Sequence, residues 1–127
     1  MLINILKSKI HRAIVTEAQI HYTGSITIDK VLMDHAKLEP FEKVMVVSLD
    51  SGERLETYVI EGKRGNKEIC LNGAAARKIL KGDRIIIMSF AIMDEKEAKN
   101  YKPIIIYLDE ENKIISEENS AEENDEC

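Results

Sequence analysis

The sequence has few of the residues that build disulfide frameworks and metal centres. Its 127 residues include two cysteines, of which Cys70 lies in an apolar run and Cys127 is the last residue, so we expect no disulfide framework. The three histidines, His11, His21 and His35, lack the spacing of a zinc site, and we expect no metal.

Long apolar segments and the common catalytic motifs are also missing. The run Leu2–Leu6 is followed by Lys7 and Lys9, so it is too short for a signal-peptide core or a membrane span, and we expect a cytoplasmic protein. There is no dinucleotide fingerprint, phosphate-binding glycine loop or nucleophile elbow. With no repeat and no internal linker, the length predicts one domain.

Most of the chain has little net charge, and the excess of acidic residues is concentrated at its C-terminal end. Asp109 to Cys127 hold nine acidic residues and one lysine, a net of −8, whereas positions 1–108 hold 17 basic and 14 acidic residues, a net of +3. Residues 116–127 contain almost nothing apolar. We therefore expect a folded domain over 1–115 and a disordered acidic tail over 116–127.

What the sequence does contain is alternating apolar residues, which predict a mainly β fold. Strands are expected over 9–16 (continuing from 2–6), 20–28, 44–49, 55–60, 68–71, 84–92 and 103–108. Short helices are expected over 30–37, 74–80 and 94–100, with Asp29 and Asn72 as N-caps of the first two. Many short strands with helical inserts are typical of a small barrel.

Two short motifs could carry chemistry. Gly24 interrupts a strand pattern before Ser25, which is typical of a bulge or a strained backbone, and glycine leaves its own carbonyl open to attack by that hydroxyl. Asn72 precedes small residues at 73–76, where exposed backbone N–H groups could bind an anion. A simple turn and a tightly packed helix start explain the same residues, so these motifs alone do not name a reaction.

Four motifs together resemble the bacterial aspartate 1-decarboxylases in order and spacing. They are Lys9-Ile-His11-Arg12, Tyr22-Thr-Gly24-Ser25, Arg54-Leu-Glu-Thr57-Tyr58 and Asn72-Gly-Ala-Ala-Ala76, and the likeness covers about residues 1–108. The resemblance implies a six-stranded double-psi β-barrel with short helices. It also implies a homotetramer with active sites between neighbouring subunits.

The resemblance further implies an inactive precursor that cleaves itself between Gly24 and Ser25 into chains 1–24 and 25–127. Ser25 would become a covalent pyruvoyl cofactor, without metal or pyridoxal phosphate. L-Aspartate would form a Schiff base with this group, lose CO2 and leave as β-alanine for pantothenate and coenzyme A. Thr57 resembles the residue that supports cleavage, and Tyr58 resembles the acid that reprotonates the substrate.

The same resemblance supplies a set of substrate-binding residues. These are Lys9, Arg54, Thr57, Asn72, Gly73, Ala74 and Ala75, with His11 and Tyr22 lining the same pocket. A non-catalytic double-psi barrel that binds nucleic acid through its +3 body is the alternative. Against it, the basic residues are scattered, no aromatic platform is present and the acidic tail would repel phosphate.

Overall fold

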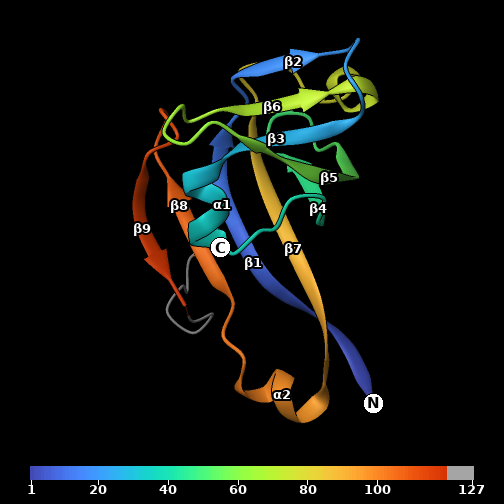
Figure 1. The fold of residues 1–127 in the computed structure, drawn as a ribbon, viewed down its shortest axis with the longest axis vertical. Coiled ribbons are helices and arrows are strands. Elements are labelled where there is room, and N and C mark those ends of the chain that lie inside the picture. Colours follow the sequence, from blue (N-terminus) through green and yellow to red (C-terminus); the bar gives the residue numbers. More distant parts are fainter. Residues whose placement is uncertain (120–127) are drawn as a thin grey trace.

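The computed structural model describes residues 1–119, and most of them lie in β strands (Figure 1). The strands are β1 (Leu2–Ile14), β2 (Glu17–Gln19), β3 (Ser25–Asp29), β4 (Lys43–Ser48), β5 (Arg54–Gly62), β6 (Ile69–Asn72), β7 (Arg84–Asp94), β8 (Ile104–Leu108) and β9 (Ile114–Glu118). The helices are α1 (Lys30–Ala36), α2 (Glu95–Asn100) and the 3-10 helix η1 (Gly73–Arg77).

The strands follow one another in the hydrogen-bonded order β2-β6-β3-β5-β4-β7-β1-β8-β9. The pairs β2–β6, β3–β5 and β1–β8 are parallel and the others antiparallel. The mainly β class with short helices is confirmed, and the mixed pairing is consistent with a double-psi barrel. We expected six strands, whereas the sheet has nine, with β2 and β9 at its two ends.

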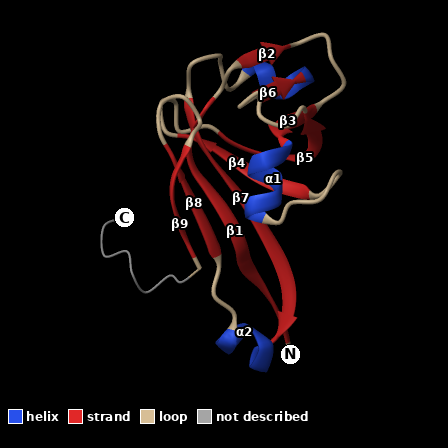
Figure 2. Cartoon of the chain, turned by 60° about the vertical axis from the view of Figure 1, so that its left-hand side comes forward, coloured by secondary structure: helices blue, strands red, loops and turns tan. Residues whose placement is uncertain are grey.

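The core forms because apolar residues alternate along the strands. Ile10 on β1, Ile26 on β3 and Ile87 on β7 are buried, whereas their neighbours Lys9 and His11 point to the other face of β1. Helix α1 closes this core between β3 and β8, as Figures 1 and 2 show. Most of the apolar burial therefore comes from Ile and Val on strands, as the sequence pattern predicts.

The predicted helix after Asp29 is confirmed. Asp29 caps α1 by accepting a hydrogen bond from the Val31 backbone N–H (2.8 Å). The same buried carboxylate accepts bonds from the backbone N–H groups of Gly65 and Lys67. One side chain thus fixes both the start of α1 and the loop after β5.

Strand β9 crosses the expected boundary at residue 115, because it continues to Glu118 and pairs with β8. Backbone hydrogen bonds order this segment even though it is nearly all polar. Glu117 Oε2 lies 2.9 Å from His35 Nδ1, and Glu118 Oε2 accepts from the Tyr107 hydroxyl (3.3 Å). The rest of the expected tail, residues 120–127, lies outside the described residues.

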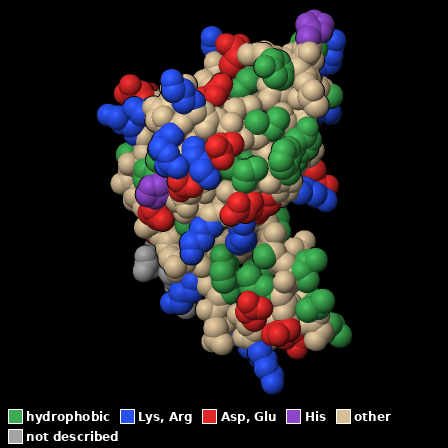
Figure 3. Space-filling view, in the orientation of Figure 1, with side chains coloured by type: hydrophobic (Ala, Val, Ile, Leu, Met, Phe, Trp, Pro, Cys, Tyr) green, Lys and Arg blue, Asp and Glu red, His purple; other side chains and the backbone are tan. Residues whose placement is uncertain are grey.

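The N-terminal part of β1 and the C-terminal part of β7 form a long arm that reaches beyond the body to α2 (Figure 1). Large apolar side chains stay exposed along it, and they gather at the lower end of the face in Figure 3. They are Met1, Leu2, Ile3, Phe90 and Ile92. No helix within residues 1–119 is long and apolar enough to cross a bilayer.

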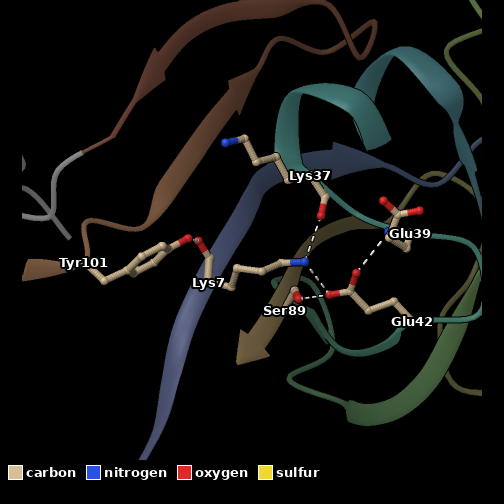
Figure 4. Close-up of polar contacts among 6 residues, drawn as sticks. All are labelled: Lys7, Lys37, Glu39, Glu42, Ser89 and Tyr101. Carbon is tan, nitrogen blue, oxygen red and sulfur yellow. Dashed lines mark hydrogen bonds and ion pairs between the residues drawn. The ribbon is translucent and has the colours of Figure 1, made fainter. Parts of the chain in front are cut away.

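A polar cluster joins this arm to the body (Figure 4). Lys7 Nζ lies 2.7 Å from Glu42 Oε2 and donates to the Lys37 carbonyl (2.8 Å), while the Ser89 hydroxyl donates to Glu42. The Tyr101 hydroxyl donates to the Lys7 carbonyl (2.6 Å). We call these five residues the Lys7–Glu42 cluster.

Burial alone raises the pKa of Glu42, but hydrogen bonds from Lys7, Ser89 and the Glu39 backbone outweigh it and hold this pKa below its usual value. Folding thus favours the charged carboxylate.

Candidate active site

The start of β3 lies beside a cavity of about 420 Å³ that brings together six of the residues expected at the site. They are Gly24, Thr57, Tyr58, Asn72, Ala74 and Ala75, and the lining also includes Leu55, Glu56 and Lys78. The strand register explains its place. Strand β3 pairs with β6 from Ser25 onward but with β5 only from Ile26. The first residues of β5 therefore extend beyond the N-terminal end of β3.

Ser25 occupies a buried position at this end of β3, with no solvent exposure. Its hydroxyl accepts a hydrogen bond from Asn72 Nδ2 (2.9 Å) and donates to the Thr23 carbonyl (3.2 Å). Asn72 Nδ2 also donates to the Thr27 hydroxyl (3.0 Å). The hydroxyl oxygen is therefore held from both sides, directly after Gly24.

The predicted N-cap role of Asn72 is wrong, since its side chain makes no cap hydrogen bond to η1. That side chain turns instead toward Ser25 and Thr27 on the neighbouring strand. The helix predicted over 74–80 is present but shorter, as the 3-10 helix η1 over Gly73–Arg77. Any anion held here would contact individual N–H groups, since so short a helix has little dipole.

The strand expected over 20–28 is wrong in its first half, since residues 20–24 form a loop and β3 begins at Ser25. Tyr22 and Gly24 are exposed there. Gly24 does not adopt a left-handed conformation; the left-handed glycine at this place is Gly73, with φ of 67°. Gly24, Ser25, Asn72 and Gly73 are called the Ser25 corner below.

Tyr58 is half-buried at the cavity and lies beside an aromatic residue that the sequence did not single out. The Phe41 ring centre lies 6.3 Å from that of Tyr58, with the planes at 31°. Phe41 is held there by a left-handed backbone (φ of 70°) and by the bond from its N–H to the Val59 carbonyl (2.7 Å). The Phe41 ring therefore packs beside the Tyr58 ring.

Six expected residues do not line this cavity: Lys9, His11, Tyr22, Ser25, Arg54 and Gly73. The register places Arg54 opposite Val47, Val47 opposite Ile86, and Ile86 opposite His11, so Arg54 and His11 share one row across four strands. Three strand spacings separate them by about 14 Å. The row lies on the face of the sheet that points away from the core.

Arg54 and Lys78 differ in what they contact. Arg54 is exposed, its nearest polar contact is Met45 Sδ (3.5 Å), and within residues 1–119 it forms no ion pair. Lys78 lines the cavity and lies 3.3 Å from Glu53 Oε2. The sequence reasoning missed Lys78, which directly follows η1 and whose backbone N–H donates to the Ala75 carbonyl (3.1 Å).

The surroundings of the His11 ring favour its neutral form. Burial, followed by the charges of Lys9 and Arg12, lowers the pKa of His11. Its Nδ1 is buried without a hydrogen-bond partner in the described chain, and its ring meets Tyr107 edge-on at 5.5 Å. His11 is thus a neutral imidazole at pH 7 rather than a third cation.

The chemistry available at the cavity is that of a hydroxyl group. Cys70 lies close to Asn72, but burial and then the charges of Glu68 and Glu17 raise the pKa of its thiol to about 11, so it stays protonated. No cluster of three or more potential metal ligands occurs in residues 1–119. Ser25 is the candidate nucleophile, and the adjacent Gly24 carbonyl is its candidate target.

Comparison with known proteins points to one family. The family model for aspartate decarboxylase matches residues 1–115. The chain belongs to the aspartate decarboxylase family. An aspartate 1-decarboxylase of Clostridium kluyveri is 60% identical over 115 residues, 91% of each chain.

Two further relatives extend the comparison. The aspartate 1-decarboxylase of Thermoanaerobacter pseudethanolicus is 59% identical over 112 residues, which is 88% of this chain and 96% of the relative. That of Caldicellulosiruptor saccharolyticus is 54% identical over 127 residues, covering 100% of this chain and 98% of the relative. The family match includes every residue at the Ser25 corner and around the cavity.

Proposed function

We propose that this chain is an aspartate 1-decarboxylase that converts L-aspartate to β-alanine and CO2. The observation that carries the proposal is the buried Ser25 hydroxyl, held by Asn72 directly after Gly24 and beside the cavity. Relatives at 54–60% identity carry that name. β-Alanine made in this way would serve pantothenate and coenzyme A synthesis, and we expect the enzyme to work in the cytoplasm.

The chain first has to cleave itself. Ser25 Oγ adds to the Gly24 carbonyl carbon, the bond from this carbon to the Ser25 nitrogen breaks, and the hydroxyl proton ends on the freed amine, which leaves an ester. Loss of the Ser25 Cα proton then expels the Gly24 carboxylate. Water finally replaces the nitrogen, which leaves as ammonia, and residue 25 becomes a pyruvoyl group.

The residues at the Ser25 corner suit this sequence of steps, which needs no metal and no oxidant. Asn72 donates to Ser25 Oγ and fixes its direction, while the Thr23 carbonyl receives the hydroxyl proton's hydrogen bond. Thr57 lines the same cavity and is proposed to support the cleavage. A pyruvoyl group at residue 25 would supply a ketone that accepts electrons from the bond broken in decarboxylation.

The remaining residues are proposed to bind the substrate and move its proton. Tyr58 would deliver a proton to the substrate carbon that has lost CO2. Arg54 would grip a carboxylate with two parallel hydrogen bonds, and Lys9 would add a point charge. Lys78 is the cation that the chain itself brings to the cavity lining. The N–H groups of Gly73, Ala74 and Ala75 with Asn72 would complete the anion site, and Tyr22 would close it.

We also propose a homotetramer with each site between two subunits. Lys9, His11 and Arg54 lie on an outward sheet face rather than in the cavity of their own chain. A second copy laid against the cavity would bring these residues to it. The exposed apolar arm of β1 and β7 gives such an assembly a surface to bury.

The nucleic-acid alternative has no comparable support. Family membership and the concave site beside a buried hydroxyl both favour a small-molecule enzyme.

Intact-mass analysis of the purified chain, before and after incubation with an extract of the native host, tests this function. We expect fragments 1–24 and 25–127, with the larger one blocked to N-terminal sequencing by its pyruvoyl group. Adding L-aspartate should then yield β-alanine and CO2. A chain that stays whole and unblocked even with the extract would overturn the proposal.

A further inference from the structure

Gly73 makes an unusually close backbone contact with Gly24. A Cβ atom built on Gly73 would lie 2.7 Å from Gly24 Cα, 2.8 Å from Gly24 N and 2.8 Å from the Tyr22 carbonyl oxygen. All three neighbours are backbone atoms, which cannot rotate out of the way. Gly73 also adopts φ of 67°, a conformation that suits glycine.

This contact completes a clamp around the bond to be cleaved. Asn72 holds Ser25 Oγ from one side, at 2.9 Å. Gly73, the next residue, backs the Gly24 main chain, which carries the carbonyl that Ser25 would attack. The nucleophile and its target are thus positioned by two consecutive residues at the junction of β6 and η1.

We propose that Gly73 is a positioning residue for self-cleavage: its missing side chain lets η1 support Gly24 where the Ser25 hydroxyl can reach it. This rests on the proposed function and adds to it, because the resemblance gives Gly73 only a substrate-binding backbone N–H. Gly73 takes part in no bond making or breaking. It acts through the placement of Gly24.

The surroundings decide which side yields when a methyl group is added at Gly73. Gly73 and Asn72 are buried, and Asn72 pairs with Ser25 across β6 and β3. Tyr22, Thr23 and Gly24 are exposed, and a Cβ on Gly24 itself would meet nothing within 4 Å. The loop can therefore move outward while the sheet stays intact. The Gly24 carbonyl would then move away from the Ser25 hydroxyl.

The test compares the cleavage half-times of Gly73→Ala and two matched glycine variants, each measured by intact mass on the full chain. Gly82 has φ of 92° and open space around its Cβ position, so Gly82→Ala carries the backbone cost alone. Gly62 has ordinary φ, but its Cβ would lie 2.9 Å from the Ile28 carbonyl oxygen, so Gly62→Ala carries a backbone clash away from Gly24.

A displacement of about 1 Å at a reacting group can slow a reaction by about 100-fold, and we expect Gly73→Ala to slow cleavage by about that factor. Gly82→Ala and Gly62→Ala should cleave within about threefold of the unaltered chain, while thermal unfolding shows what each costs in stability. Equal cleavage rates for Gly73→Ala and Gly82→Ala would overturn the role of Gly73.

Should Gly73→Ala not fold, the exposed loop supplies the deciding variant. Thr23→Gly keeps every hydrogen-bonding backbone group but loosens the chain that Gly73 supports, so cleavage should slow by about two- to fivefold. An unchanged rate there counts against the proposal. Failure of the unaltered chain to cleave even with the host extract would overturn the proposed function itself, which separates the two results.

Discussion

The Lys7–Glu42 cluster and the Ser25 corner are both polar groups set among β strands, but they are built differently. In the cluster, a lysine and a carboxylate lie 2.7 Å apart and share their remaining hydrogen bonds with Ser89 and a backbone carbonyl. At the Ser25 corner the groups are neutral, and they lie against an exposed loop and a cavity.

This difference separates stabilising polar groups from reactive ones. The cluster joins distant parts of the chain, the β1–β7 arm and the α1–β4 connection, through paired charges. The Ser25 corner holds one hydroxyl beside one carbonyl, with free space in front. A buried serine on its own would not distinguish the two, since Ser25 and Ser89 are both about fully buried.

The largest contrast should come from the two serines. Ser25→Ala should abolish cleavage and β-alanine formation, because the attacking oxygen is gone, while the sheet stays folded. Ser89→Ala should cleave normally and lower only the unfolding temperature. Intact mass, β-alanine assay and thermal unfolding on both variants check this; any β-alanine from Ser25→Ala would remove Ser25 from the chemistry.

Tyr58→Phe should separate cleavage from turnover at the same cavity. The phenol is not part of the Ser25 corner, so the precursor should still be cut. Turnover per cleaved chain should fall by about 100-fold or more, the usual contribution of a positioned acid. Phe41→Leu is the control, since it removes the neighbouring ring and keeps the phenol. Normal turnover in Tyr58→Phe would exclude the acid role.

The cations should differ according to their surroundings. Arg54→Ala should raise the KM for L-aspartate by about 10- to 100-fold, the value of hydrogen bonds to a charged group. Lys78→Ala should raise it by about threefold, because Lys78 is exposed and already faces Glu53. Initial rates over a range of aspartate concentrations check both. An unchanged KM for Arg54→Ala would argue against its carboxylate grip.

The smallest effect on activity is expected in the other region. Glu42→Gln should leave cleavage and KM unchanged and should destabilise the fold at pH 7 by about 2 kcal/mol. Folding lowers the pKa of Glu42, so its stabilisation is complete above the ordinary value of 4.5 and is lost as pH falls through the lowered folded value.

Urea unfolding at pH 7 and pH 3 measures how much the Glu42 carboxylate contributes to the free energy of unfolding. The gap between Glu42→Gln and the unaltered chain should narrow at the lower pH. Lys43→Met is a surface control, because Lys43 forms an exposed ion pair with Glu56 and should change stability far less. An equal gap at both pH values would show that the charge of Glu42 does not stabilise the fold.

Local signals were sufficient for much of the fold. Asp29 caps α1 as expected, and the strands expected over 44–49 and 55–60 pair as the antiparallel β4 and β5. These features depend on residues close in sequence, so their chemistry can be read directly. The grouping of Gly24, Thr57 and Asn72 in one cavity needed the family resemblance as well.

The errors share a physical cause, which is competition from distant partners. Asn72 is a good N-cap by type, yet its Nδ2 donates to Ser25 and Thr27 on another strand, and its Oδ1, the capping atom, accepts from the Cys70 thiol. Residues 116–118 lack apolar groups, yet β8 offers them a backbone edge. Phe41 and Lys78 reach the site through the fold rather than through any motif.

The position of β1 has a consequence for the matured protein. A cut after Gly24 makes β1 part of a separate molecule, although it pairs with both β7 and β8 and contributes Ile10 and Ala13 to the core. Once denatured, the two pieces must find each other in solution before they can refold. After cleavage, the rate at which a subunit refolds from denaturant should therefore depend on protein concentration. The uncleaved subunit refolds as a single chain.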